Sequence, residues 1–403
     1  MARNIFMNFI SRLLSESIET RQGTVLAVLA TVFFSTCGVG AFTFSLSLSA
    51  DSIGMSASWL GLAFSGYFLA RLVLAPLAGC SADYFGPIPL LRWACGIGTV
   101  VPCLYLFFPE VESLGIIQIC LGFCAGIVKP VSMSLLGQCA AQKKRGRLFA
   151  LYNTCLYCAF VIGPIVGGAG IGLQGKMGSL TLIWPALGLG VSFGALLMSK
   201  ADNALTSSEK QKEKEGLPWR NAGFLSLLLA VLGRTAGASV VITFLPRLIS
   251  EYFGLSGFFA GFLFAIPNLI IILAMPVTGR WADTRDRFGL TFLGMGFCAA
   301  CLFGLGQPVP LWLFCLLVAG MGLGSALSLP ASMSLAADMG GAKGQVMGFF
   351  LGVSNLGFVL GPGIAGFAAE AGGMADAFEL TALFGGLCLL PTLIFMSKRL
   401  YAE

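Results

Sequence analysis

Three basic residues stand inside long apolar stretches of this sequence, where charged side chains are rare: Arg71, Lys129 and Arg234. A charge at the depth of a lipid bilayer costs about 2.5–3.5 kcal/mol on insertion scales, so such residues should face a wet cavity or an opposite charge. The same stretches hold no Asp or Glu near their middles. The natural partner is therefore an anionic ligand, held by Arg through its planar fork and by Lys as a point charge.

Uncharged polar and aromatic residues on the same stretches are candidates for the rest of a binding site. Those that we assign to it are Tyr157, Asn268 and Asn355, and further candidates are Tyr67, Tyr152 and Asn153. Each such residue more often forms a hydrogen bond between helices than a ligand contact.

The sequence has no set of residues that indicates catalysis or metal binding. It contains 13 Cys and no His, and its two C-x-x-C pairs, Cys155/Cys158 and Cys298/Cys301, lie in apolar stretches. Cys in that setting behaves as a small buried hydrophobe. No nucleophile–base set and no nucleotide loop is found. We expect no enzyme activity, no cofactor and no metal site.

The elements that must position these residues are membrane-spanning helices. Hydrophobic residues make up 57% of the 403 residues and charged residues 10%, with a mean hydropathy of +0.89. A soluble domain of this length needs more charge, whereas a spanning helix needs about 20 mostly apolar residues. We predict an all-α integral membrane protein with helices at 24–48, 57–78, 88–107, 113–137, 148–172, 178–198, 221–246, 257–278, 288–306, 310–336, 344–368 and 377–397.

The distribution of Lys and Arg predicts the orientation. With the N-terminus inside, nineteen of the 24 basic residues fall in cytoplasmic segments and only Lys176 and Arg247 fall on the other side. Positive residues favour the cytoplasmic side, so we expect a multi-pass protein of the cell membrane with both termini cytoplasmic. The net charge of +6 does not indicate nucleic-acid binding, because the basic residues lie in short gaps between apolar stretches. The predicted parts are a cytoplasmic segment 1–23, a six-helix bundle 24–198, a polar cytoplasmic linker 199–220, a second six-helix bundle 221–397 and a cytoplasmic tail 398–403.

The two predicted bundles are related by an internal repeat with an offset of 200 residues. Matched positions include Gly54/Gly254, Gly61/Gly261, Pro76/Pro276, Gly79/Gly279, Asp83/Asp283 and Pro130/Pro330. Two duplicated halves are typical of transporters that bind substrate between the halves at the bilayer midplane. The three cations break the repeat, since their counterparts are Ile271, Leu329 and Phe34. That is expected of a site that became specialised after duplication.

The segment between the second and third predicted helices carries a loop motif. It reads Gly79-Cys-Ser-Ala-Asp83-Tyr-Phe-Gly86-Pro, and the second half has Gly279-Arg-Trp-Ala-Asp283-Thr-Arg285-Asp-Arg287. Both resemble the loop pattern of the major facilitator superfamily, although Tyr84 and Pro87 replace its Arg residues. The resemblance implies that Asp83 and its neighbours latch the two halves on the cytoplasmic side. The alternative is that Asp83 only caps the third helix, where a carboxylate gains from the helix dipole.

A second motif lies in the fifth predicted helix and recurs in the eleventh. The two copies are Gly163-Pro164-Ile-Val-Gly167-Gly168 and Gly361-Pro362-Gly-Ile-Ala-Gly366. They resemble the antiporter motif of the superfamily's drug–proton exchangers, which implies exchange or efflux. The alternative is close helix packing without a role in the direction of transport. Gln118 stands where such exchangers often have an Arg in the fourth helix.

These patterns together predict a secondary active transporter working by alternating access, which exchanges or exports a small organic anion or an amphipathic metabolite. One alternative is proton-coupled efflux of hydrophobic drugs, and another is a non-transporting sensor or assembly factor. The expected partners are an anionic small molecule, a coupling proton or counter-substrate, and the lipid bilayer. We expect no nucleic acid, and function as a monomer.

Overall fold

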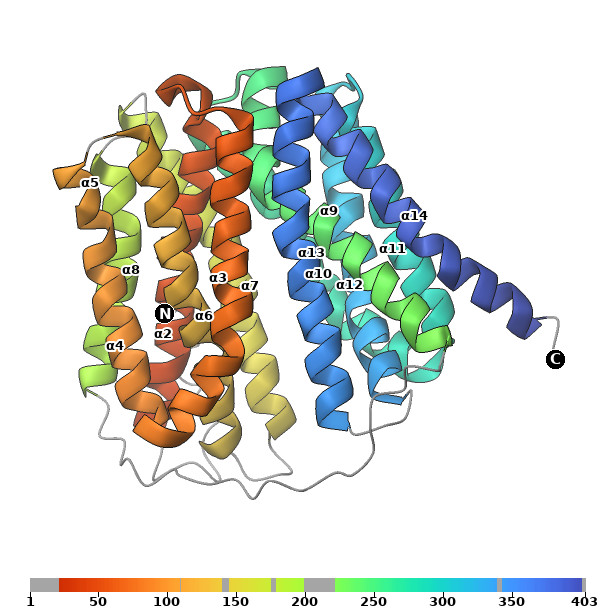
Figure 1. Ribbon diagram of the computed structural model, residues 1–403, viewed down its shortest axis with the longest axis horizontal. Coiled ribbons are helices and arrows are strands. Elements are labelled where there is room, and N and C mark those ends of the chain that lie inside the picture. The colour runs from red at the N-terminus through yellow and green to blue at the C-terminus, as the bar shows by residue number, and fades with distance from the viewer. Residues whose placement is uncertain are drawn as a thin grey trace, which may run out of the picture.

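The computed structural model describes residues 22–108, 110–139, 145–174, 179–198, 222–338 and 343–400, and all regular structure in these ranges is helical. The predicted linker 199–220 and most of the two predicted terminal segments lie outside them. The chain packs as two helical bundles side by side, the first in red to yellow-green and the second in green to blue (Figure 1). This all-helical membrane architecture confirms the predicted fold class.

In the described residues, 10 helices are long and apolar enough to cross a membrane, and four of them belong to the first bundle, which also has the shorter apolar helix Leu182–Met198. Its elements are α2 (Gln22–Ser49), η1 (Asp51–Ile53), α3 (Ala57–Phe85), α4 (Pro87–Val100), η2 (Val101–Cys103), α5 (Leu104–Phe107), α6 (Val111–Cys139), α7 (Arg145–Gln174) and α8 (Ser179–Met198). The third predicted helix corresponds to α4, η2 and α5. Its 3-10 turn contains Pro102, which has no N–H to donate to the helical ladder.

The second bundle contains the other six of these helices. Its elements are α9 (Ala222–Phe253), α10 (Gly257–Thr284), α11 (Arg287–Gly306), α12 (Leu311–Asp338), α13 (Lys343–Gly372) and α14 (Met374–Leu400). We call the side of the molecule where α8 ends and α9 begins the linker end. The side where α2 and α9 end is called the opposite end.

The internal repeat reappears as repeated geometry. The turns before α3 and α10 both use a glycine with positive φ, 74° at Gly54 and 55° at Gly254. A Cβ added at Gly122 would meet the backbone of Tyr67, and one added at Gly322 would meet the backbone of Pro267. The two contacts are equivalent, because Gly322 and Pro267 stand 200 residues after Gly122 and Tyr67, which is the offset of the sequence repeat.

Several helices are longer than predicted, which moves the acidic residues of the loop motif. Helix α3 continues to Phe85 and α10 to Thr284, so Asp83 and Asp283 lie in the last turns of helices and the prediction of loop positions is wrong. The chain turns only at Gly86, with φ of 85°. The apolar run marks the part of a helix inside hydrocarbon, and hydrogen bonding continues past it.

Asp83 does not occupy the N-cap position of α4, the third predicted helix. The residue before α4 is Gly86, which makes no side-chain cap. In the second bundle the cap is Asp286, whose carboxylate accepts from Phe288 N at 3.1 Å and Gly289 N at 2.8 Å. Asp83 instead lies near the negative end of the α3 dipole, which disfavours a carboxylate.

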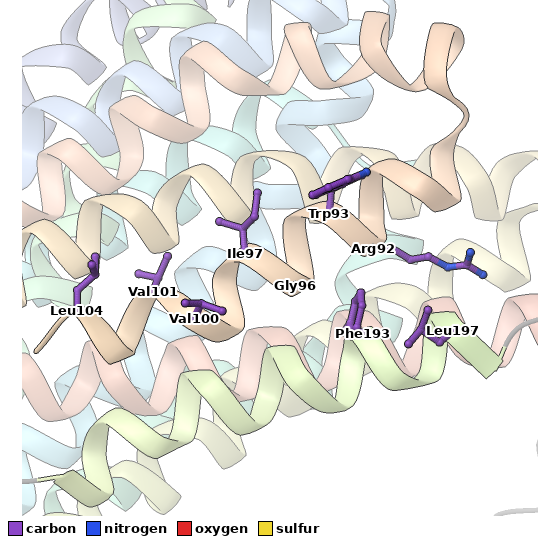
Figure 2. A pocket seen from close by; sticks show the side chains of 9 residues that line it. All are labelled: Arg92, Trp93, Gly96, Ile97, Val100, Val101, Leu104, Phe193 and Leu197. Atoms are coloured by element: carbon purple, nitrogen blue, oxygen red, sulfur yellow. The ribbon is translucent and has the colours of Figure 1, made fainter. Parts of the chain in front are cut away.

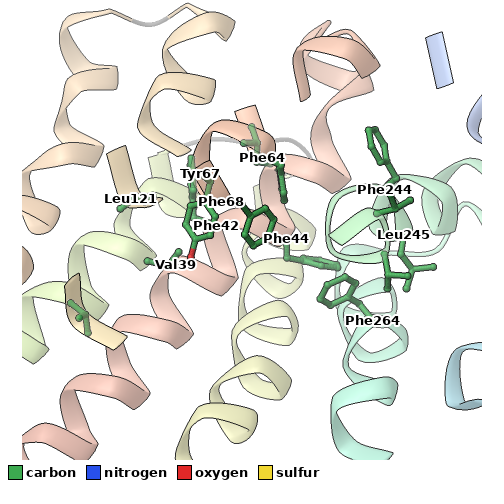
Figure 3. Packing of buried hydrophobic residues seen from close by; sticks show 14 of the residues in the cluster. Val39, Phe42, Phe44, Phe64, Tyr67, Phe68, Leu121, Phe244, Leu245 and Phe264 are labelled. Carbon is green, nitrogen blue, oxygen red and sulfur yellow. The ribbon is translucent and has the colours of Figure 1, made fainter. Parts of the chain in front are cut away.

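The core of the protein is continuous across the two bundles toward the opposite end. Figure 3 shows Phe42, Phe44 and Phe64 of the first bundle near Phe244 and Phe264 of the second. The Phe44 and Phe264 ring centroids are 5.3 Å apart. Tilted aromatic pairs of this kind contribute beyond their buried area, so this part of the interface is well packed.

Candidate functional site

Polar contacts join the bundles at the opposite end. The hydroxyl of Ser47 in α2 donates to the carbonyl of Thr243 in α9, and Ser65 Oγ donates to Val359 O at 2.7 Å. Arg247 forms an ion pair with Asp51, including Nε to Oδ2 at 2.9 Å. Among the described residues, the hydrogen bonds and ring contacts that join the two bundles are found in the half of the molecule between mid-membrane and the opposite end. The structure is thus sealed at the opposite end.

The first copy of the antiporter-like motif lies in α7 and makes two kinds of contact. A Cβ at Gly163 would meet Cys37 O at 2.8 Å in α2, and one at Gly167 would collide with the carbonyl of Ala41, also in α2. A Cβ at Gly168 would instead collide with the carbonyl of Gly257 in α10 of the other bundle. Pro164 faces α10 too, since its carbonyl would meet a Cβ added at Gly261.

The second copy, in α13, makes the matching contacts. A Cβ at Gly361 would collide with the carbonyl of Ala236 in α9, within the second bundle. A Cβ at Gly366 would meet Ala57 O at 2.7 Å in α3 of the first bundle, and the carbonyl of Pro362 would meet a Cβ added at Gly61. The motif therefore supplies two equivalent close approaches between bundles, α7 with α10 and α3 with α13.

Close packing of α3 on α6 brings Arg71 and Lys129 together. A Cβ at Gly126 would lie 3.1 Å from Arg71 Cα, so the absence of a side chain lets α6 approach at that level. Lys129 follows three residues later on α6, near enough to Arg71 for the two charges to interact. Arg71 lies fourteen residues from either end of α3, deeper than the apolar run alone indicated.

Aromatic side chains surround this pair of cations. The Arg71 guanidinium carbon lies 5.9 Å from the Phe68 ring centroid, and Lys129 Nζ lies 4.9 Å from that of Phe160. Tyr67 lies beside Arg71, and the Tyr152 hydroxyl donates to the backbone carbonyl of Lys129 at 3.4 Å. Aromatic faces attract cations but do not neutralise them, so these rings supply no negative charge to the pair.

The third cation, Arg234, joins this group through α7. Arg234 interacts electrostatically with Tyr157 of α7 and Cys298 of α11, and the Tyr157 and Phe160 ring centroids are 6.2 Å apart. An unbroken series thus runs from the pair Arg71 and Lys129 through two rings of α7 to Arg234 in the other bundle. Phe160 was not predicted, although its place three residues after Tyr157 puts both on one helix face.

The guanidinium of Arg234 is incompletely satisfied. Its Nε is buried with no hydrogen-bond partner, and it lines a cavity of about 20 Å³ with Cys298, Ser325 and Thr381. A cavity of this size holds about one water molecule. An organic substrate does not fit in a cavity of this size.

The remaining candidate residues are placed less closely. Asn268 in α10 and Asn355 in α13 are half-buried, and neither amide makes a hydrogen bond among the described residues. Gln118 is fully buried, and its Nε2 lies 3.2 Å from Thr43 Oγ1. It therefore ties α6 to α2 inside the first bundle and carries no charge.

The predicted cytoplasmic latch lies at the linker end. Gly79 and Gly279 have open space around them. Asp283 and Arg285 are exposed, and Arg285 stacks on Trp281 at 4.8 Å. Arg287 donates to Ala282 O at 2.8 Å and pairs with Asp338. These contacts stay within the second bundle, so the latch role of these residues and of Asp83 remains a prediction.

The protein has two repeated helical bundles, and charged side chains lie where the bundles meet. This architecture is typical of secondary transporters. The chain belongs to the Major Facilitator Superfamily, whose family model matches residues 28–309 and 224–401. It is a transporter and not an enzyme, as predicted.

Similar proteins differ in what their names say they carry. A putative tartrate transporter of Agrobacterium vitis is 24% identical over 390 residues, covering 88% of this chain and 82% of that protein. The multidrug resistance protein MdtG of Proteus mirabilis is 24% identical over 334 residues, covering 80% and 82%. A bacterial homologue of the human lysosomal transporter Spinster, solved in an inward-facing and occupied conformation, matches with a TM-score of 0.77 at 14% identity over 94% of this chain and 97% of that one.

Proposed function

We propose that this transporter carries a small organic anion, bound between Arg71 and Lys129 on one side and Arg234 on the other. The observation that supports this is the lack of acidic partners. Among the described residues the ion pairs are Arg247 with Asp51 and Arg287 with Asp338, and neither includes the three cations. Like charges held together away from water repel each other, so an anion that enters relieves both the desolvation and the repulsion.

The number of cations favours a substrate with two negative groups. One group would bind Arg71 and Lys129, which belong to the first bundle, and the other would bind Arg234 in the second. Such a ligand contacts both bundles and can follow them through a change of conformation. A dicarboxylate such as tartrate, the substrate named for one relative, has this chemistry.

The conformation supports a site that opens toward the cytoplasm. The Lys and Arg bias predicts that the linker end lies inside the cell, and Ser47, Ser65 and Arg247 join the two bundles toward the opposite end. Alternating access then requires these contacts to break while the linker end closes. The resemblance to the antiporter motif implies exchange or efflux, so we propose that the anion is exported or exchanged.

Efflux of hydrophobic drugs is the second candidate, because aromatic rings form much of the site and one relative is named a multidrug resistance protein. The two functions differ in their need for positive charge. A neutral drug would contact Phe160 and Tyr157 without needing Arg234, whereas a dianion needs all three cations.

The test is transport in proteoliposomes loaded with one dicarboxylate and challenged with a panel of carboxylates and neutral drugs. Removing one partner of a buried charged hydrogen bond costs about 2–5 kcal/mol. Arg234→Ala should therefore reduce anion transport at least about thirtyfold, and Arg234→Lys should reduce it less. Arg280→Gln, at an exposed cation of α10, is the control and should transport normally. Anion transport by Arg234→Ala at the wild-type rate would overturn the proposal, and transport of neutral drugs alone would support efflux.

A further inference from the structure

One cavity lies away from the candidate site, on the outer surface of the first bundle. It has a volume of about 650 Å³ and lies between α4 and α8. Figure 2 shows Trp93, Ile97 and Val100 along α4 and Phe193 and Leu197 along α8, with Arg92 at one end and Leu104 at the other. We call this feature the α4–α8 groove.

Apart from one side chain, the groove is apolar and open to the surroundings. Trp93 is 70% exposed, Ile97 57% and Val100 64%. Exposed apolar surface of this extent in a membrane protein faces lipid chains. Trp93 lies less than two turns from the linker end of α4, where the amphipathic indole suits the boundary between headgroups and hydrocarbon.

Arg92 is the exception, and its geometry is fixed. Its Nε and Nη2 donate to the carbonyl of Leu196, near the end of α8, at 3.2 and 2.9 Å. A guanidinium has five N–H donors, so three remain after these two bonds. Arg92 is thus held at the end of the groove with donors to spare.

The length of the groove indicates what fills it. Arg92 and Leu104 are twelve residues apart, or about 18 Å along a helix. The hydrocarbon core of a bilayer is about 30 Å thick, so the groove extends through little more than one leaflet. A partner helix would need an apolar strip across both leaflets, whereas a phospholipid needs one.

We propose that the α4–α8 groove binds an anionic phospholipid, with its phosphate headgroup on Arg92 and an acyl chain along Ile97, Val100 and Leu104. The Lys and Arg bias places Arg92 in the cytoplasmic leaflet, where anionic lipids exert their negative surface potential. The second bundle provides a natural contrast, because the position equivalent to Arg92 is Phe292. The same surface of the second bundle lacks the cation, and the proposal assigns no headgroup site there.

The test measures lipid contact at Trp93. The purified protein is reconstituted with phosphatidylglycerol or phosphatidylcholine carrying brominated acyl chains, which quench tryptophan fluorescence on contact. The contribution of Trp93 is obtained by difference from Trp93→Phe. Quenching of Trp93 should show a preference of about fivefold for phosphatidylglycerol, the contribution of one basic residue at an anionic surface.

Variants separate the headgroup from the groove. Arg92→Gln should bring the preference close to one, while Arg280→Gln, which removes an exposed cation of the second bundle, should leave it unchanged. Gly96→Leu fills the groove near Phe193 and should reduce quenching by both lipids, whereas Gly296→Leu, at the equivalent position of the second bundle, should not. Folding of each variant is checked by its elution volume and melting temperature. If Arg92→Gln does not fold, Arg92→Lys, which keeps the charge, must keep the preference for the proposal to stand.

Three results would overturn the proposal. One is an equal response of wild-type Trp93 to the two lipids, and another is a preference that survives Arg92→Gln. The third is protection of Trp93 from both lipids with a concentration-dependent dimer, which would show that a second copy of the chain covers the groove.

Discussion

The ion pair between Arg247 and Asp51 should hold the opposite end closed, and its removal should open that end. Asp51→Asn keeps the shape of the side chain and removes its charge. Arg247 would then stay desolvated, with its side chain 15% exposed and one nitrogen, Nη1, already buried without a partner. The sealed conformation is destabilised, because in the open one the guanidinium reaches water.

The size of the effect follows from the exposure of the two partners. Unit charges about 4 Å apart attract by about 4 kcal/mol at an effective dielectric constant of 20, but exposed pairs contribute only about 0.2–1 kcal/mol. The Asp51 side chain is 56% exposed, whereas that of Arg247 is largely buried. We therefore expect the loss of the ion pair to destabilise the sealed conformation by about 1–2 kcal/mol, between these two limits. That corresponds to an approximately five- to thirtyfold rise in the open population.

Pulsed EPR distances between spin labels at Ser52 and Glu251, in a background without native cysteines, measure that population. Both residues are exposed and lie on different bundles beside the ion pair. Glu370→Gln is the matched control: Glu370 accepts from Ser58 N at 3.2 Å across the same interface while exposed, so its loss should change the population less than about twofold. An unchanged distance distribution in Asp51→Asn, or an equal shift in the control, would refute this reasoning.

The latch prediction is that Asp83→Asn weakens the state closed at the linker end, so that reagents added from the cytoplasm label nearby cysteines faster; unchanged labelling and transport would count against it. Gly168→Leu should separate α7 from α10 at Gly257 and so favour the state that is open at the opposite end. The expected result is folded protein with reduced transport. Gly167→Leu strains packing within the first bundle and should lower the melting temperature, since overpacking costs about 1–3 kcal/mol; equal behaviour of the two variants would contradict the assignment of the two contacts. A cysteine at position 210 should stay unlabelled from outside sealed cells, and rapid labelling would reverse the orientation.

Most of the fold could be predicted from the sequence because hydrophobicity dominates it. A helix that crosses a bilayer must be apolar for about 20 residues, and the repeat offset of 200 then relates the two bundles. Helix ends were the weak point. Polar residues such as Asp83 look like loop in a hydropathy pattern, yet helical hydrogen bonding continues until Gly86 turns the chain.

The candidate site was predictable in its charges and less so in its neighbours. Arg71, Lys129 and Arg234 stand out because a charge in hydrocarbon is costly. Which of them meet depends on packing: Gly126 admits α3 close to α6, and nothing in the sequence pairs Lys129 with Phe160. The ion pair of Arg247 with Asp51 joins residues 196 positions apart. Its partners belong to different bundles, so no pattern within one bundle could predict it.

The two close approaches between the bundles have a mechanical consequence. Gly168 lies 23 residues from the start of α7 at Arg145, and Gly366 lies 23 residues from the start of α13 at Lys343. At about 1.5 Å per residue, each helix is a lever of about 35 Å pivoting on a glycine. Tilting it by about 10° moves its far end by about 6 Å, the width of a small organic molecule. A tilt about these two contacts, where backbone touches backbone, would therefore leave the packing near Gly168 and Gly366 almost unchanged while it moved the linker end by several ångströms.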